Sequence, residues 1–359
     1  MNVLSLFDGM SCGQQALERA GIKVDKYFAS EIDKYAMQVT MANYPNTIQL
    51  GSVVNVNGYD LPKIDLLIGG SPCQSFSFAG KRKGMSTKDE QEILTLEHYL
   101  QLKEEGFEFE GQSYLFWEYM RLLNEVKPKY FLLENVMMGE KWEKILSKAI
   151  GVKPIFINSS LVSAQNRQRL YWTNIGLEPQ GLFGDLESII QQPKDKQMFL
   201  KDILEEEVSQ KYFLSDKLIS WLEKHSLKRG SEFKKKTGED KSCCLTATAQ
   251  AKTNLSTDYI ITHNLQRRSA DRPSLKENKN AGGSGHLSKS DGNTYCLDIG
   301  NTQAVEYKSN IRRLTPIECE RLQTVKDNYT NFVSDSQRYK MLGNGWTVDV
   351  IVHILNYIK

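Results

Sequence analysis

Short apolar runs alternate with longer amphipathic segments over the first half of the chain, from about residue 2 to residue 174. The apolar runs have the length of buried strands, and the segments between them carry apolar residues three and four positions apart, as helices do. This alternation is typical of βα units around a mostly parallel sheet. The sequence therefore predicts a doubly wound α/β domain, with strands at 3–7, 26–30, 64–68, 130–133 and 170–174 and helices at 13–20, 34–43, 113–126 and 140–149.

The pattern changes after Gly176, where the apolar rhythm weakens. Lysine-rich and glycine- and serine-rich stretches appear, notably KKKTGEDK at 234–241 and NKNAGGSGHLSKSDGN at 278–293. Helical periodicity returns at 315–323 and 347–358, and no internal repeat is found. We therefore expect a main domain at 1–175, a smaller irregular domain at 176–310, and a segment at 311–359 that returns to the main domain.

Composition and charge narrow the class of protein only a little. A chain of 359 residues with 40% hydrophobic and 25% charged residues is an ordinary globular protein, long enough for two domains. The net charge of +2 indicates no nucleic-acid partner by itself, so DNA contacts would depend on local patches. Six cysteines without zinc-ligand spacing predict free thiols and no metal. No apolar stretch approaches ~18 residues and the N-terminus has no basic lead-in, so we expect a cytoplasmic protein that does not span a membrane.

Two features near the N-terminus are compatible with a nucleoside site. LFDGMSCG at 6–13 follows the first predicted strand and opens a helix, so its turn presents backbone N–H groups at the carboxyl edge of the sheet. The second strand ends at Glu31, whose carboxylate could accept hydrogen bonds from both hydroxyls of a ribose. An ordinary βα turn and a merely solvated glutamate would give the same pattern, so neither feature identifies a site alone.

Cys73 lies in GGSPCQSFS, directly after the apolar run DLLIG. A lone cysteine is more often a small buried hydrophobe. Here a proline precedes it, glycines permit close approach, and polar residues follow, at the sheet edge where α/β enzymes place ligands. Because a thiol of pKa ~8.5 is a weak nucleophile at neutral pH, a catalytic role requires a nearby positive charge, such as an arginine from elsewhere in the chain.

A carboxylate and two arginines are candidates for the same edge. FLLENV at 131–136 brings Glu134 to the end of a buried strand. Such a residue often caps the next helix, but a partly buried glutamate can also donate a proton to a ring nitrogen near pH 7. In SAQNRQRLYW, Arg167 and Arg169 stand two apart on an extended segment and therefore on one face. Surface arginine pairs are common, although this one precedes an apolar run.

Together these residues resemble the DNA cytosine-5 methyltransferase family, over roughly 2–175 and 311–358 and in the family's motif order. FDGMSCG resembles the methionine-binding turn, SEID the ribose-binding strand end, and GGSPCQ the catalytic Pro-Cys loop. ENV resembles the cytosine-binding motif and QNRQR the paired-arginine strand. RRLTPIECERLQ and GNGWTVDVI match the two C-terminal motifs. Pro-Cys, ENV and QxRxR in this order are hard to obtain by chance.

The resemblance implies a class I S-adenosylmethionine-dependent methyltransferase fold and methyl transfer from S-adenosyl-L-methionine to carbon 5 of a flipped-out cytosine in duplex DNA. It makes Cys73 the nucleophile at carbon 6, places Glu134 at ring nitrogen 3 and Arg169 at the 2-oxo group, and puts Arg167 near the thiolate and phosphates. The cofactor-binding residues that it implies are Phe7, Asp8, Gly9, Met10, Ser11, Cys12, Gly13, Glu31, Ile32, Ser52, Val53 and Asn344.

Departures from the family pattern are informative. Ser11 and Cys12 stand where many members have glycines, and GNGW replaces the commoner GNSV. With SYLFWEYMRLL at 113–123, these features resemble the de novo-type animal enzymes and certain phage or bacterial relatives. Ser52 stands where the family usually has an aspartate that reaches the adenine amino group. We therefore do not expect tight adenine recognition by that side chain.

Two further segments are expected to contact DNA. The polar loop from Gln74 to about Gly111, with GKRKG at 80–84, is predicted to be a mobile lid with phosphate contacts, a solvated basic loop being the alternative. The segment 176–310 is predicted to be the target-recognition domain. Candidates for phosphate or guanine contacts there are Lys234, Lys235, Lys236, Arg267, Arg268 and Arg272, none of which we assign to a base.

Two other functions remain open. One is an RNA cytosine-5 methyltransferase of the tRNA type on the same scaffold, although a long module after Gly176 favours duplex DNA. The other is an inactive DNA-binding relative, which the presence of Cys73, Glu134, Arg167 and Arg169 disfavours. We expect a monomer that acts on double-stranded DNA in a bacterial or phage-infected cell. The sequence leaves open the target sequence, a preference for hemimethylated sites and a partner restriction enzyme.

Overall fold

The computed structural model describes residues 1–72, 85–88, 91–109, 111–180, 185–213, 215, 233–235, 263–265, 304–307 and 310–359. The main strands are β1 Asn2–Leu6, β2 Lys26–Ser30, β3 Ile48–Gln49, β4 Leu66–Gly70, β5 Tyr130–Val136, β6 Ile155–Asn158 and β7 Gln168–Thr173. The helices are α1 Cys12–Arg19, α2 Lys34–Asn43, α3 Leu96–Glu104, α4 Leu115–Val126, α5 Glu140–Ile150, α8 Pro316–Leu322, α9 Asp335–Asn344 and α10 Val348–Leu355. Shorter strands pair as hairpins: β8 Leu177–Gln180 with β9 Asp185–Ser188, β10 Phe233–Lys235 with β11 His263–Leu265, and β12 Ala304–Tyr307 with β13 Asn310–Arg313.

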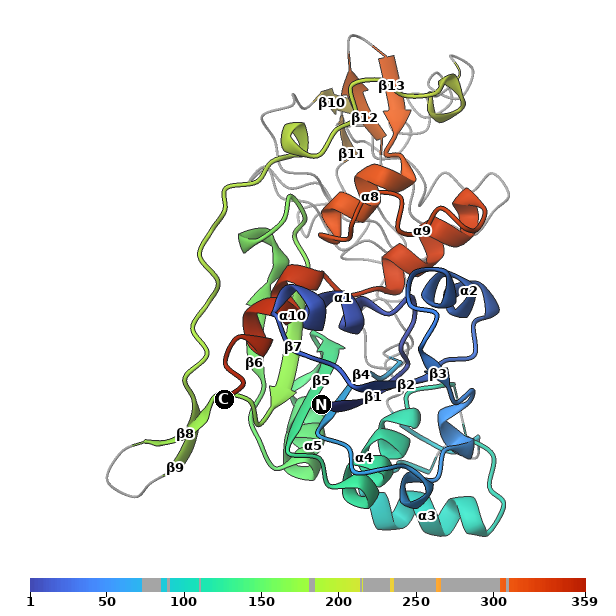
Figure 1. Cartoon of the computed structure of the whole chain (residues 1–359), viewed down its shortest axis with the longest axis vertical. Coiled ribbons are helices and arrows are strands. Elements are labelled where there is room, and N and C mark those ends of the chain that lie inside the picture. The colour runs from blue at the N-terminus through green and yellow to red at the C-terminus, as the bar shows by residue number, and fades with distance from the viewer. Residues whose placement is uncertain are drawn as a thin grey trace, which may run out of the picture. The chain divides into compact units, whose positions relative to one another are not determined.

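The seven main strands form one sheet in the order β3-β2-β1-β4-β5-β7-β6 (Figure 1). β1 pairs in parallel with β2 and β4, and β4 pairs in parallel with β5. β7 runs antiparallel to β5. The carboxyl ends of β1, β2, β4 and β5 therefore meet at one edge, together with the start of β7. The predicted doubly wound, mostly parallel sheet is confirmed.

Helices cover both faces of this sheet because neighbouring residues of a strand point in opposite directions. On one face, a Cβ added to Gly13 of α1 would lie 2.5 Å from the Ile68 side chain of β4. On the other, the next residue, Gly69, lies against the ring of Tyr119 from α4. α1 also packs beside α10, the last helix of the chain (Figure 1). Both faces of β4 are thus buried, as its continuous apolar sequence predicts.

One prediction is wrong in part. The sequence predicts a polar lid over 74–111, whereas Leu96–Glu104 form helix α3. The Thr95 hydroxyl caps this helix by accepting from the His98 N–H at 3.2 Å, and Tyr99 and Leu102 are buried. The Tyr99 ring packs against Phe109, with centroids 5.0 Å apart. The basic part of the predicted lid, GKRKG at 80–84, lies outside the described residues.

The chain divides into two compact units. Unit 1 comprises Met1–Ile157, Gln168–Pro193 and Val348–Lys359, and unit 2 comprises Asn158–Arg167 and Lys194–Thr347. The contacts thus assign most of the C-terminal segment, through Thr347, to unit 2, and return only Val348–Lys359 to the sheet. The division into catalytic and target-recognition domains that the sequence suggests stays a prediction. Arg267, Arg268, Arg272 and Lys236 lie outside the described residues, and Lys234 and Lys235 lie in β10.

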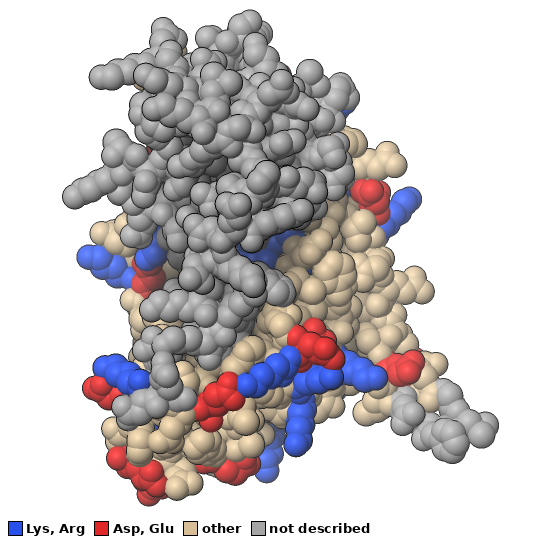
Figure 2. All heavy atoms as spheres, turned by 180° about the vertical axis from the view of Figure 1, so that it is seen from behind, with Lys and Arg blue, Asp and Glu red and all other residues tan. Residues whose placement is uncertain are grey.

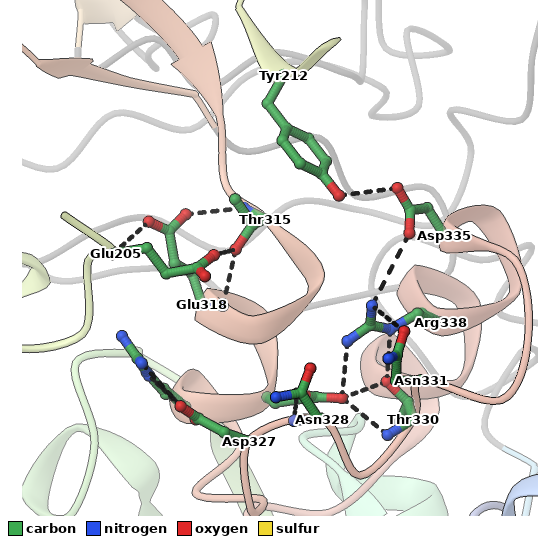
Figure 3. A network of polar contacts seen from close by, with 12 residues as sticks. Glu205, Tyr212, Thr315, Glu318, Asp327, Asn328, Thr330, Asn331, Asp335 and Arg338 are labelled. Carbon is green, nitrogen blue, oxygen red and sulfur yellow. Dashed lines mark hydrogen bonds and ion pairs between the residues drawn. The ribbon is translucent and has the colours of Figure 1, made fainter. Parts of the chain in front are cut away.

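Buried polar contacts order the helical part of unit 2 (Figure 3). Thr315 and Glu318 form a capping box at the start of α8, and the Glu318 carboxylate also pairs with Arg312 at 2.6 Å. Glu320, on the same helix, accepts from the Thr330 N–H at 2.8 Å and pairs with Arg338 of α9 at 3.1 Å. These charges are almost fully buried, so each needs its partner to offset the cost of leaving water. The motif RRLTPIECERLQ therefore holds α8, α9 and the segment between them together.

Exposed charges are mixed in sign. Where Figure 2 shows described side chains, lysine and arginine alternate with aspartate and glutamate. Exposed ion pairs such as Lys141–Glu92 and Lys144–Glu140 account for part of this mixing and stabilise the fold little. No helix among the described residues is long and apolar enough to cross a membrane.

Candidate active site

The turn after β1 has a backbone that few sequences adopt. Phe7, Gly9 and Ser11 all have positive φ, at 57°, 59° and 63°. Two of the three are not glycine, and such residues enter this region at a cost that the surrounding structure must offset. Ser11 is the N-cap of α1 and is fully buried. Gly9 has open space where a Cβ would point. The predicted turn at 6–13 is therefore a shaped loop with an open side.

Glu31 fixes this turn to the end of β2. One carboxylate oxygen accepts the Gly9 N–H at 2.7 Å. The other accepts the N–H groups of Ile32 and Asp33, at 2.7 and 2.8 Å. Three backbone donors thus hold the carboxylate in one orientation. A ligand hydroxyl at Glu31 would meet an acceptor that is already preorganised.

Asp8 is a residue of this turn. Its two carboxylate oxygens accept from the hydroxyls of Tyr27 at 2.7 Å and Ser11 at 2.6 Å. Burial raises the pKa of Asp8 to about 6, although the hydrogen bonds from Ser11 and Tyr27 oppose this rise. The Gln14 side-chain amide donates to the Ser11 hydroxyl at 3.0 Å and to the Thr47 hydroxyl at 2.8 Å. Asp8 therefore shapes the turn from inside.

Asp8 predicts a pH dependence of stability. Its pKa is raised on folding from 3.8 to about 6, so the contribution of Asp8 to stability is greatest below pH 4 and falls by roughly 2–3 kcal/mol as the pH rises through 6. Asp8→Asn removes the titration and keeps an acceptor for Tyr27. Urea unfolding should show the variant gaining stability relative to the parent between pH 4.5 and 7. Asp60→Asn, at an exposed aspartate, is the matched control, and an equal gain there would refute the assignment.

The remaining residues predicted to bind the cofactor divide into exposed and buried groups. Ile32 is 71% exposed beside Glu31, although isoleucine is usually buried. Ser52 begins the single turn η1 Val53–Asn55, and Ser30 at the end of β2 donates to the Gly51 carbonyl at 2.8 Å, which holds the two strand ends together. Met10, Cys12, Gly13 and Val53 are buried.

These features fit a nucleoside-containing cofactor in unit 1. An exposed apolar side chain next to a fixed carboxylate suits the apolar face of a base and the hydroxyls of a ribose. The open side of Gly9 leaves room for the remainder of such a molecule. The turn at 7–11, Glu31–Ile32 and Gly51–Val53 meet at the carboxyl ends of β1, β2 and β3, where doubly wound folds bind ligands.

Glu31→Ala should weaken binding of S-adenosyl-L-homocysteine by ~1.5–3 kcal/mol, because a charge-assisted hydrogen bond is lost and the turn loses its anchor at Gly9. Calorimetry measures the affinity, and thermal melting reports the stability lost with the three backbone bonds. Glu18→Ala on α1 removes only a bond to the Tyr44 hydroxyl and should leave the affinity unchanged. Equal affinities of the parent and Glu31→Ala would place the cofactor elsewhere.

Glu134 and Arg169 form an ion pair across β5 and β7. The Arg169 Nε lies 2.7 Å from a Glu134 carboxylate oxygen, and both side chains are almost buried. In the strand register Glu134 is opposite Tyr171 and Val136 is opposite Arg169, so the pair spans the strands diagonally. Glu134 is also opposite Gly70, the last residue of β4. The structure thus brings the carboxylate and one of the two arginines together at the predicted edge.

Asn135, next to Glu134, contacts the chain just before the predicted nucleophile. Its side-chain amide donates to the carbonyl and hydroxyl oxygens of Ser71, at 3.2 and 3.0 Å, and both residues are buried. Ser71 precedes Cys73 by two residues, and Cys73 itself lies outside the described residues. Sequence reasoning missed this contact. A buried polar asparagine between Glu134 and Val136 was the available signal, since buried amides need partners.

The Arg167 side chain contacts main-chain carbonyls of unit 2. It is buried, and its guanidinium donates to the carbonyls of Gly343 and Gly345 at 3.3 and 2.8 Å. These glycines flank Asn344, the exposed last residue of α9 that is predicted to bind the cofactor. Gln323 donates to the same Gly345 carbonyl at 3.2 Å. Arg167 therefore anchors residues 343–345, a structural role that its sequence motif did not predict.

The sheet order, the turn after β1 and the Glu134–Arg169 pair define a class I methyltransferase fold with a polar site at the carboxyl edge. The family model for C-5 cytosine-specific DNA methylases matches residues 1–359. The chain belongs to this family and is a DNA cytosine-5 methyltransferase.

Relatives from phages and bacteria support this membership. The orphan methyltransferase M.SPRI of Bacillus phage SPR is 28% identical over 99% of this chain and 96% of its own length. The type II methyltransferase M.NlaX of Neisseria lactamica is 27% identical over the same shares of the two chains. Among solved structures, the Entamoeba histolytica methyltransferase EhMeth and the S. pombe Dnmt2 methyltransferase each match with a TM-score of 0.60 over 99% of this chain and 97% of theirs. At 17% identity these structures show the fold alone.

Proposed function

We propose that this enzyme transfers the methyl group of S-adenosyl-L-methionine to carbon 5 of a cytosine flipped out of duplex DNA, with Cys73 as a covalent nucleophile. The observation that carries the proposal is the Glu134–Arg169 pair at 2.7 Å, next to the contact of Asn135 with Ser71. A carboxylate and a guanidinium at one strand edge match the polar groups of a cytosine ring, and the adjacent chain leads to a cysteine within two residues.

The chemistry explains why these residue types are needed. Carbon 5 of cytosine attacks a sulfonium methyl group too weakly without help. Addition of the Cys73 thiolate to carbon 6 moves electrons into the ring, and carbon 5 of the resulting enamine attacks the methyl group, which breaks the sulfur–methyl bond and releases S-adenosyl-L-homocysteine. A base then removes the carbon 5 proton, and the carbon–sulfur bond breaks to release the thiolate. Glu134 in its protonated form stabilises the enamine, because its O–H donates a proton to ring nitrogen 3 and its other oxygen accepts from the 4-amino group.

The arginines have separate roles in this proposal. Arg169 holds the 2-oxo group, and its ion pair with Glu134 keeps both side chains close together before the base arrives. Arg167 acts near the thiolate and the phosphates, and it also secures the residues that flank Asn344. The methyl donor occupies the turn at 7–11 with Glu31 at its ribose and Ile32 against its adenine.

The target base must leave the helix for this reaction, at a cost of a few kcal/mol for unstacking and unpairing. We assign closure over the base to the lid segment around GKRKG at 80–84, whose charges suit phosphates. We assign readout of the target sequence to 176–310. The enzyme acts as a monomer on double-stranded DNA.

Bisulfite sequencing of plasmid DNA from cells that express the protein tests the proposed substrate. We expect protected cytosines within one short sequence and none in plasmid from cells that express Cys73→Ala. Bisulfite sequencing of RNA from the same cells tests the alternative, an RNA cytosine-5 methyltransferase of the tRNA type. Protected RNA with fully converted plasmid DNA would contradict the proposal.

A further inference from the structure

Arg121 of helix α4 binds main-chain carbonyl groups of a surface loop. One terminal nitrogen of the guanidinium donates to the carbonyls of Val53 and Val56, at 3.1 and 2.9 Å. These carbonyls lie at the start and immediately after the end of η1, the single turn that follows Ser52. The loop therefore cannot move away from α4 without losing two charge-assisted hydrogen bonds.

Two carboxylates of the same helix fix the guanidinium in turn. Glu118 accepts from the Arg121 Nε at 2.7 Å, and Glu125 accepts from the other terminal nitrogen at 2.8 Å. The second oxygen of Glu125 accepts the Gly58 N–H at 2.7 Å. A Cβ on Gly58 would lie 2.7 Å from the Glu125 Cβ, so only glycine allows this approach. The position of Arg121 is thus set by its own helix, and the chain beyond η1 is anchored to that helix as well.

The network also includes contacts to helix α3, which do not involve the loop. Glu118 is fully buried, and its other oxygen accepts from the Tyr99 hydroxyl at 2.5 Å and from Lys103, both on α3. Loss of the Tyr99 hydroxyl would disturb the same buried carboxylate without removing a contact to Val53 or Val56. The chain therefore provides its own control for a purely structural effect.

We infer that Arg121 is a positioning residue for the adenine end of the methyl donor, an inference that rests on the proposed function. Ser52 stands where the family resemblance places an aspartate, and it begins η1 without a side-chain capping hydrogen bond. A short, neutral serine recognises an adenine amino group less strongly than a carboxylate does. Recognition then depends on how firmly the main chain of Ser52–Val53 is held, and Arg121 holds it.

The test measures affinity for two cofactor products by calorimetry: S-adenosyl-L-homocysteine and its inosine analogue, which lacks the adenine amino group. The parent should prefer the adenine form. Arg121→Gln should weaken S-adenosyl-L-homocysteine binding by about tenfold or more and reduce the preference toward one. It should also raise the KM for S-adenosylmethionine while kcat at saturation stays close to that of the parent. Arg121→Lys keeps the charge but not the planar guanidinium, so its affinity for S-adenosyl-L-homocysteine should lie between those of the parent and Arg121→Gln. It provides a second test if Arg121→Gln is unstable.

Tyr99→Phe is the matched control, expected to lower the melting temperature and leave both affinities unchanged. A folded Arg121→Gln or Arg121→Lys protein with the parent's preference for adenine would overturn the inference, as would a parent without such a preference. Equal losses in Tyr99→Phe and Arg121→Gln would reduce Arg121 to a structural residue. A parent that binds neither product would refute the proposed cofactor itself, which is a different outcome.

Discussion

Replacing Cys73 with alanine should lower methyl transfer to duplex DNA by roughly four orders of magnitude or more, the scale on which enzymes lose activity without their covalent nucleophile. The physical reason is that carbon 5 becomes nucleophilic only after the thiolate adds to carbon 6. Serine at this position should be as inactive, because its hydroxyl ionises too weakly to add. Tritium transfer from labelled S-adenosylmethionine to plasmid DNA measures the rate.

The same variants should keep their affinity for S-adenosyl-L-homocysteine, because in the proposed mechanism the thiol acts on the base, whereas the proposed cofactor site is the turn at 7–11 and Glu31. Calorimetry and thermal melting of Cys73→Ala provide that comparison. Turnover within tenfold of the parent would contradict the covalent mechanism. Lost turnover together with lost cofactor affinity would point to a folding defect instead, and Cys73→Ser then provides the second test.

Glu134→Gln should reduce turnover ~100- to 1000-fold, the range expected for loss of a general acid. Glutamine loses the ion pair with Arg169, whose Nε lies 2.7 Å from the carboxylate, but it has nearly the same size and shape, so the strand edge should stay packed. It cannot donate a proton to ring nitrogen 3, so the enamine loses its stabilisation. Steady-state assays with saturating DNA separate this loss in kcat from weaker binding.

Glu143→Gln on helix α5 is the matched control, because it makes the same chemical change outside the predicted site. Its turnover should equal that of the parent. A Glu134→Gln enzyme with a parental kcat and a raised KM for DNA would assign Glu134 to binding alone and contradict its role as an acid.

The architecture of unit 1 could be predicted where sequence periodicity is strong. The bounds of β2 and α2 are as predicted, because the apolar residues Tyr27, Phe28 and Ala29 form the centre of β2, and Asp33 caps the following helix by accepting from the Tyr35 N–H at 2.9 Å. β5 runs to Val136, three residues beyond its predicted end, because Glu134 and Asn135 continue the ladder with β7 despite their polarity. The polar residues at the end of β5 therefore made the predicted strand too short, and one of them, Glu134, belongs to the candidate site.

Other elements carried too little local signal. β3 has two residues and depends on pairing with β2, which no sequence pattern reports. α3 has apolar residues at helical spacing, Leu96, Tyr99 and Leu100, and the prediction of a polar loop over 74–111 missed this pattern. α9 begins in the polar sequence DSQRYK and is stabilised by the buried Arg338–Glu320 pair. For β3 and α9, distant contacts decide the local structure.

In the candidate site, likewise, some residues could be predicted from the sequence and the contacts that position them could not. The turn, Glu31 and Glu134 follow strands and could be located from the strand pattern alone. The contacts that position them could not, because Asn135 reaches Ser71 and Arg121 reaches Val53 across more than sixty residues. The bonds from Arg167 to Gly343 and Gly345 span still more of the chain. Such pairs are set by the fold, so a single sequence leaves them open.

Covalent trapping tests the central claim most directly. Duplex DNA with 5-fluorocytosine at the target should form an adduct with Cys73 when S-adenosylmethionine is present, because fluorine at carbon 5 cannot leave as a proton does and elimination stalls. The adduct should survive denaturing electrophoresis, and peptide mass spectrometry should place it on the peptide that contains Cys73. A mismatch opposite the target should speed trapping, since part of the unpairing cost is already met. The contradicting results are no adduct on a fluorinated duplex that the enzyme binds, or an adduct on any of the other cysteines, Cys12, Cys243, Cys244, Cys296 and Cys319.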